Sequence, residues 1–253
     1  MTTRTERWPA GTPAWADLTV PSLDEARAFY GPLLGWEFEG GGPETGGYTV
    51  ATMGGRRVAG LGEAPEGQAA EPQWCVYIAT DDINASVARA GAAGADVVVG
   101  ATSIPGMATM AIVADPTGAL FGLWQSGHHT GWDVSEEPGA VVWTEVMSTD
   151  QPMSLAFYRQ VLELDADDMS GGGFVYATLR RGATPVAGVG GSDGPAAWTV
   201  YVAVADVDAA AARAVDLGGD VLAGPFDSPF GRNARVRGPF GETFAIITPG
   251  RRP

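Results

Sequence analysis

The chain of 253 residues contains no lysine, one cysteine and two histidines. Without lysine, Schiff-base catalysis and the lysine of a phosphate-binding loop are excluded. A single cysteine, Cys75, cannot form a disulfide within the chain, which is typical of a reducing cytoplasm. No apolar run approaches the ~20 residues that span a bilayer, and the opening MTTRTERWPAG lacks the apolar core of a signal peptide. We therefore expect a cytoplasmic protein without membrane contact.

Positive charge is also scarce, since 15 arginines stand against 30 acidic residues and the formal net charge is −15. Phosphate backbones repel so acidic a chain, and nucleic acid is therefore excluded as a partner. Hydrophobic residues make up 45% of the sequence and charged residues 18%, which is typical of an ordinary folded protein. The length is sufficient to bury one large core or two smaller ones.

Internal repetition is the most informative feature that is present. Four blocks recur in the same order in the two halves of the chain: WADLTVPSLDEARAFY (15–30) with WTEVMSTDQPMSLAFY (143–158), VAGLG (58–62) with VAGVG (186–190), WCVYIATDDINASVARAGAAGAD (74–96) with WTVYVAVADVDAAAARAVDLGGD (198–220), and DPTGALFGLW (115–124) with GPFGETFAII (238–247). We therefore expect two homologous modules, residues 12–126 and 139–249, joined by a linker over residues 127–138.

Each module repeats its own plan more weakly. A strand is followed by a capped amphipathic helix and then by short alternating segments bounded by glycine and proline, which indicate further strands. This pattern predicts an α+β fold of four βαβββ units, paired so that each module is a curved mixed sheet with its helices outside. The concave face of such a sheet is the natural place for a ligand, because it is enclosed and largely apolar. We expect two such cups.

Several motifs in this arrangement resemble the vicinal oxygen chelate superfamily, which includes glyoxalase I, bleomycin resistance proteins and extradiol dioxygenases. The motifs are the A-x-A-F-Y helix after the first strand, the D-D-I and A-D-V helix starts, and DPTGALFGLWQ (115–125). The resemblance covers nearly the whole chain. It is strongest to the two-module actinobacterial proteins that are often labelled glyoxalase-like or hydroxylase.

The resemblance implies metal ligands, typically His, Gln or Glu, on the first and last strands of the βαβββ units. This chain departs from that pattern at every such position. In place of metal ligands, these positions carry Trp15, Cys75, Gly122, Trp143, Thr199 and Ala245. The two histidines, His128 and His129, lie in the linker, where we expect them to be solvated and outside both cups. Since Trp, Gly and Ala side chains offer a metal no donor, we expect no metal ion and no other cofactor.

Strand alternation predicts which side chains line the cups. One acid follows the first tryptophan of each module by two residues, and these acids, Asp17 and Glu145, are the candidate catalytic residues. Each acid either pairs with a neighbouring group or acts as a desolvated general base. The candidate ligand-binding residues, which equally well fill a core, are Trp15, Cys75, Tyr77, Gly122, Trp124, Trp143, Thr199 and Tyr201. Gly122 leaves more room than Ala245, so we expect the first cup to be the working site.

The function that these features favour is binding of a hydrophobic or aromatic small molecule in a metal-free cup, as in the drug-binding members of the superfamily. The alternative is a metal-independent enzyme of isomerase, cyclase or hydroxylase type, which acts on a small metabolite or natural product through Asp17 or Glu145. A metal-dependent lyase or dioxygenase is less compatible with the sequence. Whether the chain is an enzyme, and whether it is a monomer or a homodimer, is left open by the sequence.

Overall fold

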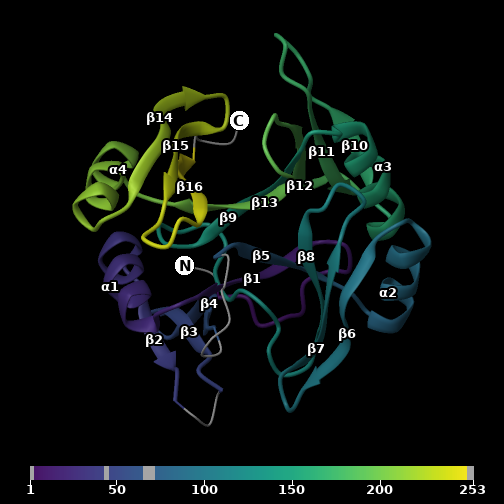
Figure 1. The fold of residues 1–253 in the computed structure, drawn as a ribbon, viewed down its shortest axis with the longest axis horizontal. Coiled ribbons are helices and arrows are strands. Elements are labelled where there is room, and N and C mark those ends of the chain that lie inside the picture. The colour runs from purple at the N-terminus through teal and green to yellow at the C-terminus, as the bar shows by residue number, and fades with distance from the viewer. Residues whose placement is uncertain (1–2, 43–45, 65–71, 250–253) are drawn as a thin grey trace.

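The computed structural model describes residues 3–42, 46–64 and 72–249, which form two eight-stranded sheets with helices outside them (Figure 1). The first sheet has the order β2-β3-β4-β1-β5-β8-β7-β6. Its strands are β1 (Pro13–Val20), β2 (Glu37–Gly40), β3 (Thr49–Met53), β4 (Arg56–Glu63), β5 (Trp74–Ala79), β6 (Asp96–Ile104), β7 (Ala108–Ala114) and β8 (Leu120–Ser126). Helices α1 (Leu23–Leu34) and α2 (Ile83–Ala92) connect them.

The second sheet repeats this order as β10-β11-β12-β9-β13-β16-β15-β14. Its strands are β9 (Val141–Ser148), β10 (Asp165–Asp168), β11 (Tyr176–Arg181), β12 (Thr184–Gly191), β13 (Ala197–Ala203), β14 (Asp220–Ser228), β15 (Gly231–Arg237) and β16 (Thr243–Pro249), with helices α3 (Gln151–Leu162) and α4 (Val207–Asp216). In the first sheet β1 pairs in parallel with β4 and antiparallel with β5. In the second sheet β9 pairs in the same way with β12 and β13. The predicted α+β fold, in which four βαβββ units pair into two mixed sheets with helices outside, is confirmed.

The four helices begin where the sequence places small polar residues. Ser22, Asp82, Asp150 and Asp206 each accept a hydrogen bond from a backbone N–H in the first turn. Such caps satisfy donors that a helix start otherwise leaves free, typically contributing ~1 kcal/mol. None of the described helices has the length and apolar character needed to cross a membrane.

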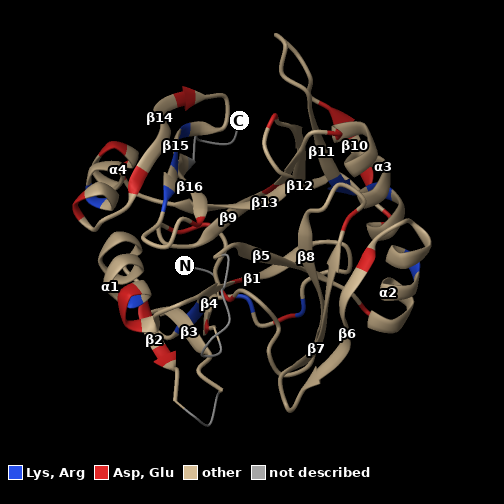
Figure 2. Ribbon diagram, in the orientation of Figure 1, with Lys and Arg blue, Asp and Glu red and all other residues tan. Residues whose placement is uncertain are grey.

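Helices pair across the two halves, α1 with α4 and α2 with α3, at opposite ends of the molecule (Figure 1). Between α1 and the second sheet, Tyr30 donates a buried hydrogen bond of 2.6 Å to Glu242. Burial is the main cause that raises the pKa of Glu242. Acidic residues lie mainly on the outer helices and edge strands, whereas the central strands are largely uncharged (Figure 2). The excess negative charge is thus kept at the periphery of the molecule, away from the central strands.

Candidate functional site

The concave face of the first sheet brings together most of the side chains that alternation selects there. Trp15 lies opposite Tyr77 and Asp17 opposite Cys75, while Tyr77 is in register with Gly122. Residues directly opposite each other on paired strands share a face of the sheet. The Trp15 indole N–H donates to the Tyr48 hydroxyl at 3.0 Å, and that hydroxyl donates to Asp17 at 3.4 Å. The Tyr77 hydroxyl also interacts with Asp17 and opposes the rise in the pKa of that carboxyl group.

The second sheet repeats this network with shorter contacts. The Trp143 indole N–H donates to the Tyr176 hydroxyl at 3.1 Å. Tyr176 donates to Oε2 of Glu145 at 2.8 Å, and Tyr201 donates to Oε1 at 2.7 Å. Thr199 lies opposite Glu145 and is buried, and Ala245 is in register with Tyr201. Both cups therefore contain a set in which one tryptophan, two tyrosines and a carboxyl group interact.

Two of these tyrosines, Tyr48 and Tyr176, are absent from the residues that the sequence singles out. Both reach their carboxyl group over a glycine of the repeated VAG segments. A Cβ at Gly60 would lie 1.8 Å from the Tyr48 hydroxyl, and one at Gly188 would lie 1.9 Å from that of Tyr176. A side chain at either glycine would displace the tyrosine. The recurrence of a tyrosine and a glycine at equal offsets in both halves was the signal available in the sequence.

Burial changes the acidity of both carboxyl groups in the same direction. It raises the pKa of Asp17 to about 7, against the opposing hydrogen bonds from Tyr77 and Tyr48. Burial also raises the pKa of Glu145. Hydrogen bonds from Tyr201 and Tyr176 and the positive charge of Arg235 lower this pKa and offset part of the rise. Desolvation disfavours the ionised form of an acid, and the phenolic donors recover only part of that loss. Both groups are stronger bases than exposed carboxylates.

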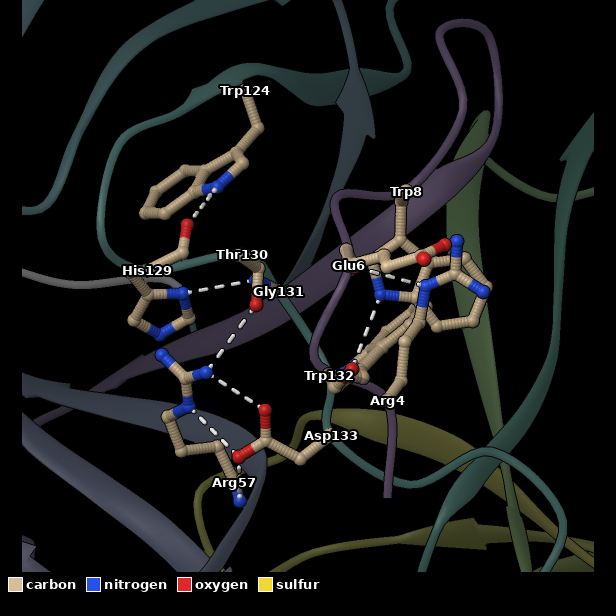
Figure 3. Close-up of polar contacts among 10 residues, drawn as sticks. All are labelled: Arg4, Glu6, Trp8, Arg57, Trp124, His129, Thr130, Gly131, Trp132 and Asp133. Atoms are coloured by element: carbon tan, nitrogen blue, oxygen red, sulfur yellow. Dashed lines mark hydrogen bonds and ion pairs between the residues drawn. The ribbon is translucent and has the colours of Figure 1, made fainter. Parts of the chain in front are cut away.

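The linker closes the first cup, contrary to the expectation that both of its histidines are solvated. His128 is exposed, but His129 is buried, with its ring centroid 4.5 Å from that of Trp15 and 5.2 Å from that of Trp124 (Figure 3). Gly131 N–H donates to its Nδ1 at 3.2 Å. Burial is the main cause that lowers the pKa of His129 to about 4. The imidazole is therefore neutral and packs against the two indoles.

An ion pair fixes this segment of the linker to the first sheet. Arg57 on β4 contacts Asp133 at 2.7 Å and donates to Thr130 at 3.4 Å (Figure 3). The Trp124 indole N–H donates to the His129 carbonyl at 3.2 Å. A loop path of this kind depends on contacts distant in sequence, so periodicity gives no sign of it. The linker thereby contributes to the filling of the first cup.

The space over Gly122 is also occupied, so the expectation of a roomier first cup is wrong. A Cβ at Gly122 would lie 2.0 Å from the Tyr77 ring, which uses the room that the glycine leaves. Trp15, Tyr77 and Trp124 expose 1%, 5% and 4% of their surface. In this cup the aromatic side chains act as core.

The second cup differs in that its tryptophan and one of its tyrosines are partly exposed, whereas Trp15 and Tyr77 of the first cup are buried. Trp143, Glu145 and Tyr201 are half-buried, and Phe174 exposes 52% of its surface while stacking on Tyr176 with 5.3 Å between ring centroids. Arg235 lies opposite Ala245 on the neighbouring strand and is exposed. The corresponding position of the first sheet, opposite Gly122, holds Ile112. Arg235, which the repeats and strand alternation do not single out, adds a cation beside Glu145.

Metal ligation does not fit either network. Within the described part of the chain, no three His, Cys, Asp or Glu side chains are grouped so that they could hold a metal ion. The carboxyl oxygens of Glu145 already accept hydrogen bonds from two phenols. Burial and the charge of Asp17 raise the pKa of Cys75, whereas a thiol must lose its proton to bind a metal. The positions that would carry ligands by family resemblance instead hold the tryptophans and the small residues beside them.

Comparison with known proteins agrees with this architecture. Residues 12–123 and 140–246 match the family described as Glyoxalase/Bleomycin resistance protein/Dioxygenase superfamily. A Mycobacterium tuberculosis protein that carries the name of a glyoxylase, CFP32, is 36% identical over 94% of this chain and 95% of its own length. The anthracycline biosynthesis protein DauV of Streptomyces sp. strain C5 is 35% identical over 95% of this chain and 94% of its own.

Solved structures share the fold at lower identity. The Mn(II)-bound glyoxalase of Novosphingobium aromaticivorans superposes with a TM-score of 0.68 at 21% identity, over 94% of this chain and 82% of its own. The 2,2',3-trihydroxybiphenyl 1,2-dioxygenase of Sphingomonas wittichii superposes with a TM-score of 0.67 at 15% identity, over 96% of this chain and 91% of its own. The repeated halves, the shared sheet order and these matches lead to one conclusion: the chain belongs to the glyoxalase/bleomycin resistance protein/dioxygenase superfamily.

Proposed function

We propose that this protein binds a hydrophobic or aromatic small molecule in the cup of its second module, without a metal ion. The observation that carries the proposal is the half-buried wall of Trp143, Glu145 and Tyr201, with the exposed ring of Phe174 beside it. Exposed aromatic rings next to a few fixed polar groups are typical of small-molecule sites. At the same positions of the first module Trp15 and Tyr77 are buried and Asp17 is half-buried, and the linker packs against Trp15.

The polar groups of the second cup suit a planar aromatic molecule that carries hydroxyl and carbonyl groups. Glu145 keeps lone pairs that can accept from a ligand hydroxyl, because each of its oxygens receives one phenolic hydrogen bond. The Arg235 guanidinium is a donor for a carbonyl or phenolate oxygen. The relatives named for anthracycline biosynthesis support a polycyclic aromatic ligand of this kind.

A metal-independent enzyme is the second candidate, and the raised pKa of Glu145 favours it. A buried carboxylate beside a cation can take a proton from a bound substrate while the cation stabilises the resulting oxyanion. Such a step suits an isomerase or cyclase reaction on a small metabolite or natural product, and it suits a hydroxylase-type reaction when dioxygen is the oxidant that reacts with the resulting carbanion. Of the two acids considered, Glu145 is the better candidate, because Asp17 lies in the cup that the linker covers.

Replacement of Phe174 tests the proposed site without disturbing the core. We expect Phe174→Ser to weaken binding of a fluorescent anthracycline about tenfold, since loss of an aromatic stacking partner costs ~1–2 kcal/mol. Fluorescence titration measures the change. Met153→Ser is the matched control, because Met153 on α3 is an exposed apolar side chain that is not part of either network. Equal affinities of the two variants would contradict the proposal.

The enzymatic alternative depends on Glu145 as the base. For any substrate that the protein turns over, we expect Glu145→Gln to lower kcat by about 10²-fold or more, the usual contribution of a general base. Ligand affinity should change much less, because glutamine still accepts a hydrogen bond. Steady-state kinetics and fluorescence titration of the same preparation separate the two effects. A variant with undiminished kcat would remove Glu145 from the mechanism.

Asp17 is expected to affect stability through its buried, protonated form. Its carboxyl group stays protonated in the folded protein up to a pKa of about 7, whereas in the unfolded chain it ionises above about 3.8. The resulting stabilisation is present below pH 3.8 and is lost as the pH rises through 7. As the pH rises from 3.8 to 7, urea unfolding should therefore show the free energy of unfolding of the wild type falling relative to that of Asp17→Asn. A constant difference across this range would contradict the assignment.

A further inference from the structure

A separate cavity of about 470 Å³ lies where the N-terminal segment and the linker meet the starts of β9 and β12. Its volume is within the usual range of small-molecule sites. We propose that this cavity binds an aromatic carboxylate, a ligand class distinct from the molecule assigned to the second cup. The inference does not rest on the function proposed for that cup.

Three tryptophans supply the aromatic walls. Trp8 comes from the N-terminal segment, Trp132 from the linker and Trp143 from β9. Trp8 and Trp132 meet edge to face, with ring centroids 5.9 Å apart, and the Trp8 indole N–H donates to the Trp132 carbonyl at 3.1 Å. Figure 3 shows this pair on the far side of the linker from His129 and Trp124. The cavity is therefore not the closed first cup.

Two arginines on the same walls are the reason for assigning an anion. The Arg4 guanidinium lies 4.4 Å from the centroid of the Trp8 ring, and it donates only to two backbone carbonyls, those of Glu6 and Arg7. Arg181 donates to the Ala10 carbonyl. Among the described residues, no carboxylate lies within ion-pair distance of either guanidinium.

Neither guanidinium therefore has an acidic partner among the described residues, although the chain contains twice as many acidic as basic residues. On β4, by contrast, Arg56 and Arg57 are both paired, with Glu137 and Asp133. The cavity wall does include one acid, Glu136, but its side chain is exposed and forms no described ion pair. Two arginines without acidic partners beside an aromatic surface suit the planar, bidentate geometry of a carboxylate.

Polar atoms without partners give independent support. Trp132 and Thr144 both line the cavity and are buried, and neither the Trp132 indole N–H nor the Thr144 hydroxyl has a hydrogen-bond partner in the structure. Unsatisfied buried donors are costly, and an acceptor on a ligand relieves that cost. Trp143 adjoins the second cup as well, since its indole N–H donates to Tyr176.

The test compares 2-naphthoate with the neutral 2-naphthalenemethanol, which have the same ring system. Calorimetric titration of the full chain should give a Kd for 2-naphthoate at least tenfold below that for the alcohol. Arg4→Gln and Arg181→Gln should each weaken 2-naphthoate binding about tenfold, as expected for loss of a charge-assisted hydrogen bond, and leave the alcohol unaffected. The double variant should show no preference for the carboxylate.

Two matched controls locate the anion. Arg213→Gln, on α4, removes an arginine that is exposed like Arg181 and lies remote from the cavity, and it should change nothing. Arg235→Gln removes the cation of the second cup and should also leave 2-naphthoate binding intact. Loss of carboxylate preference in Arg235→Gln, or its survival in the double variant, would overturn the proposal. Phe174→Ser separates it from the function of the cup, because that change should not affect 2-naphthoate.

Discussion

The hydrogen-bonded contact between a carboxyl group and two tyrosines is the constraint on which both cups depend. A buried carboxyl group is tolerated only when its oxygens have partners, and the phenols supply them. In the second module Tyr176 and Tyr201 hold one oxygen of Glu145 each, at 2.8 and 2.7 Å. The arrangement requires a bare backbone at Gly188, as the first module requires one at Gly60. It occupies the sites at which family resemblance implies metal ligands.

Because the chain is duplicated, the same network of side chains occurs twice, once packed into a core and once partly exposed. In the first module the aromatic groups serve as core, because Tyr77 fills the space above Gly122 and His129 packs against the indoles. In the second module Trp143 and Tyr201 keep partial exposure, and Arg235 replaces the apolar Ile112. One half is thereby better suited to stability and the other to a ligand. We regard this asymmetry as the main functional consequence of the duplication.

The sequence predicted the architecture well because repeats and strand alternation are local signals. Alternation placed Trp15, Asp17, Cys75 and Tyr77 on one face, as the register of β1 and β5 requires. It did not reveal Tyr48, which belongs to a different part of the sheet and depends on Gly60 for space. Nor did it reveal His129, whose burial follows from the path of the linker along Trp124 and Arg57. Side-chain reach and loop path are set by tertiary contacts, which periodicity does not record.

The central claim is that the second cup holds its ligand without a metal ion. Calorimetric titration of an anthracycline into the protein, before and after exhaustive treatment with EDTA and with the metal content measured, tests it most directly. If the second cup needs no metal ion, the affinity is the same in both preparations and does not rise when Mn(II) is restored. An affinity that disappears with the chelator and returns with Mn(II) would contradict it.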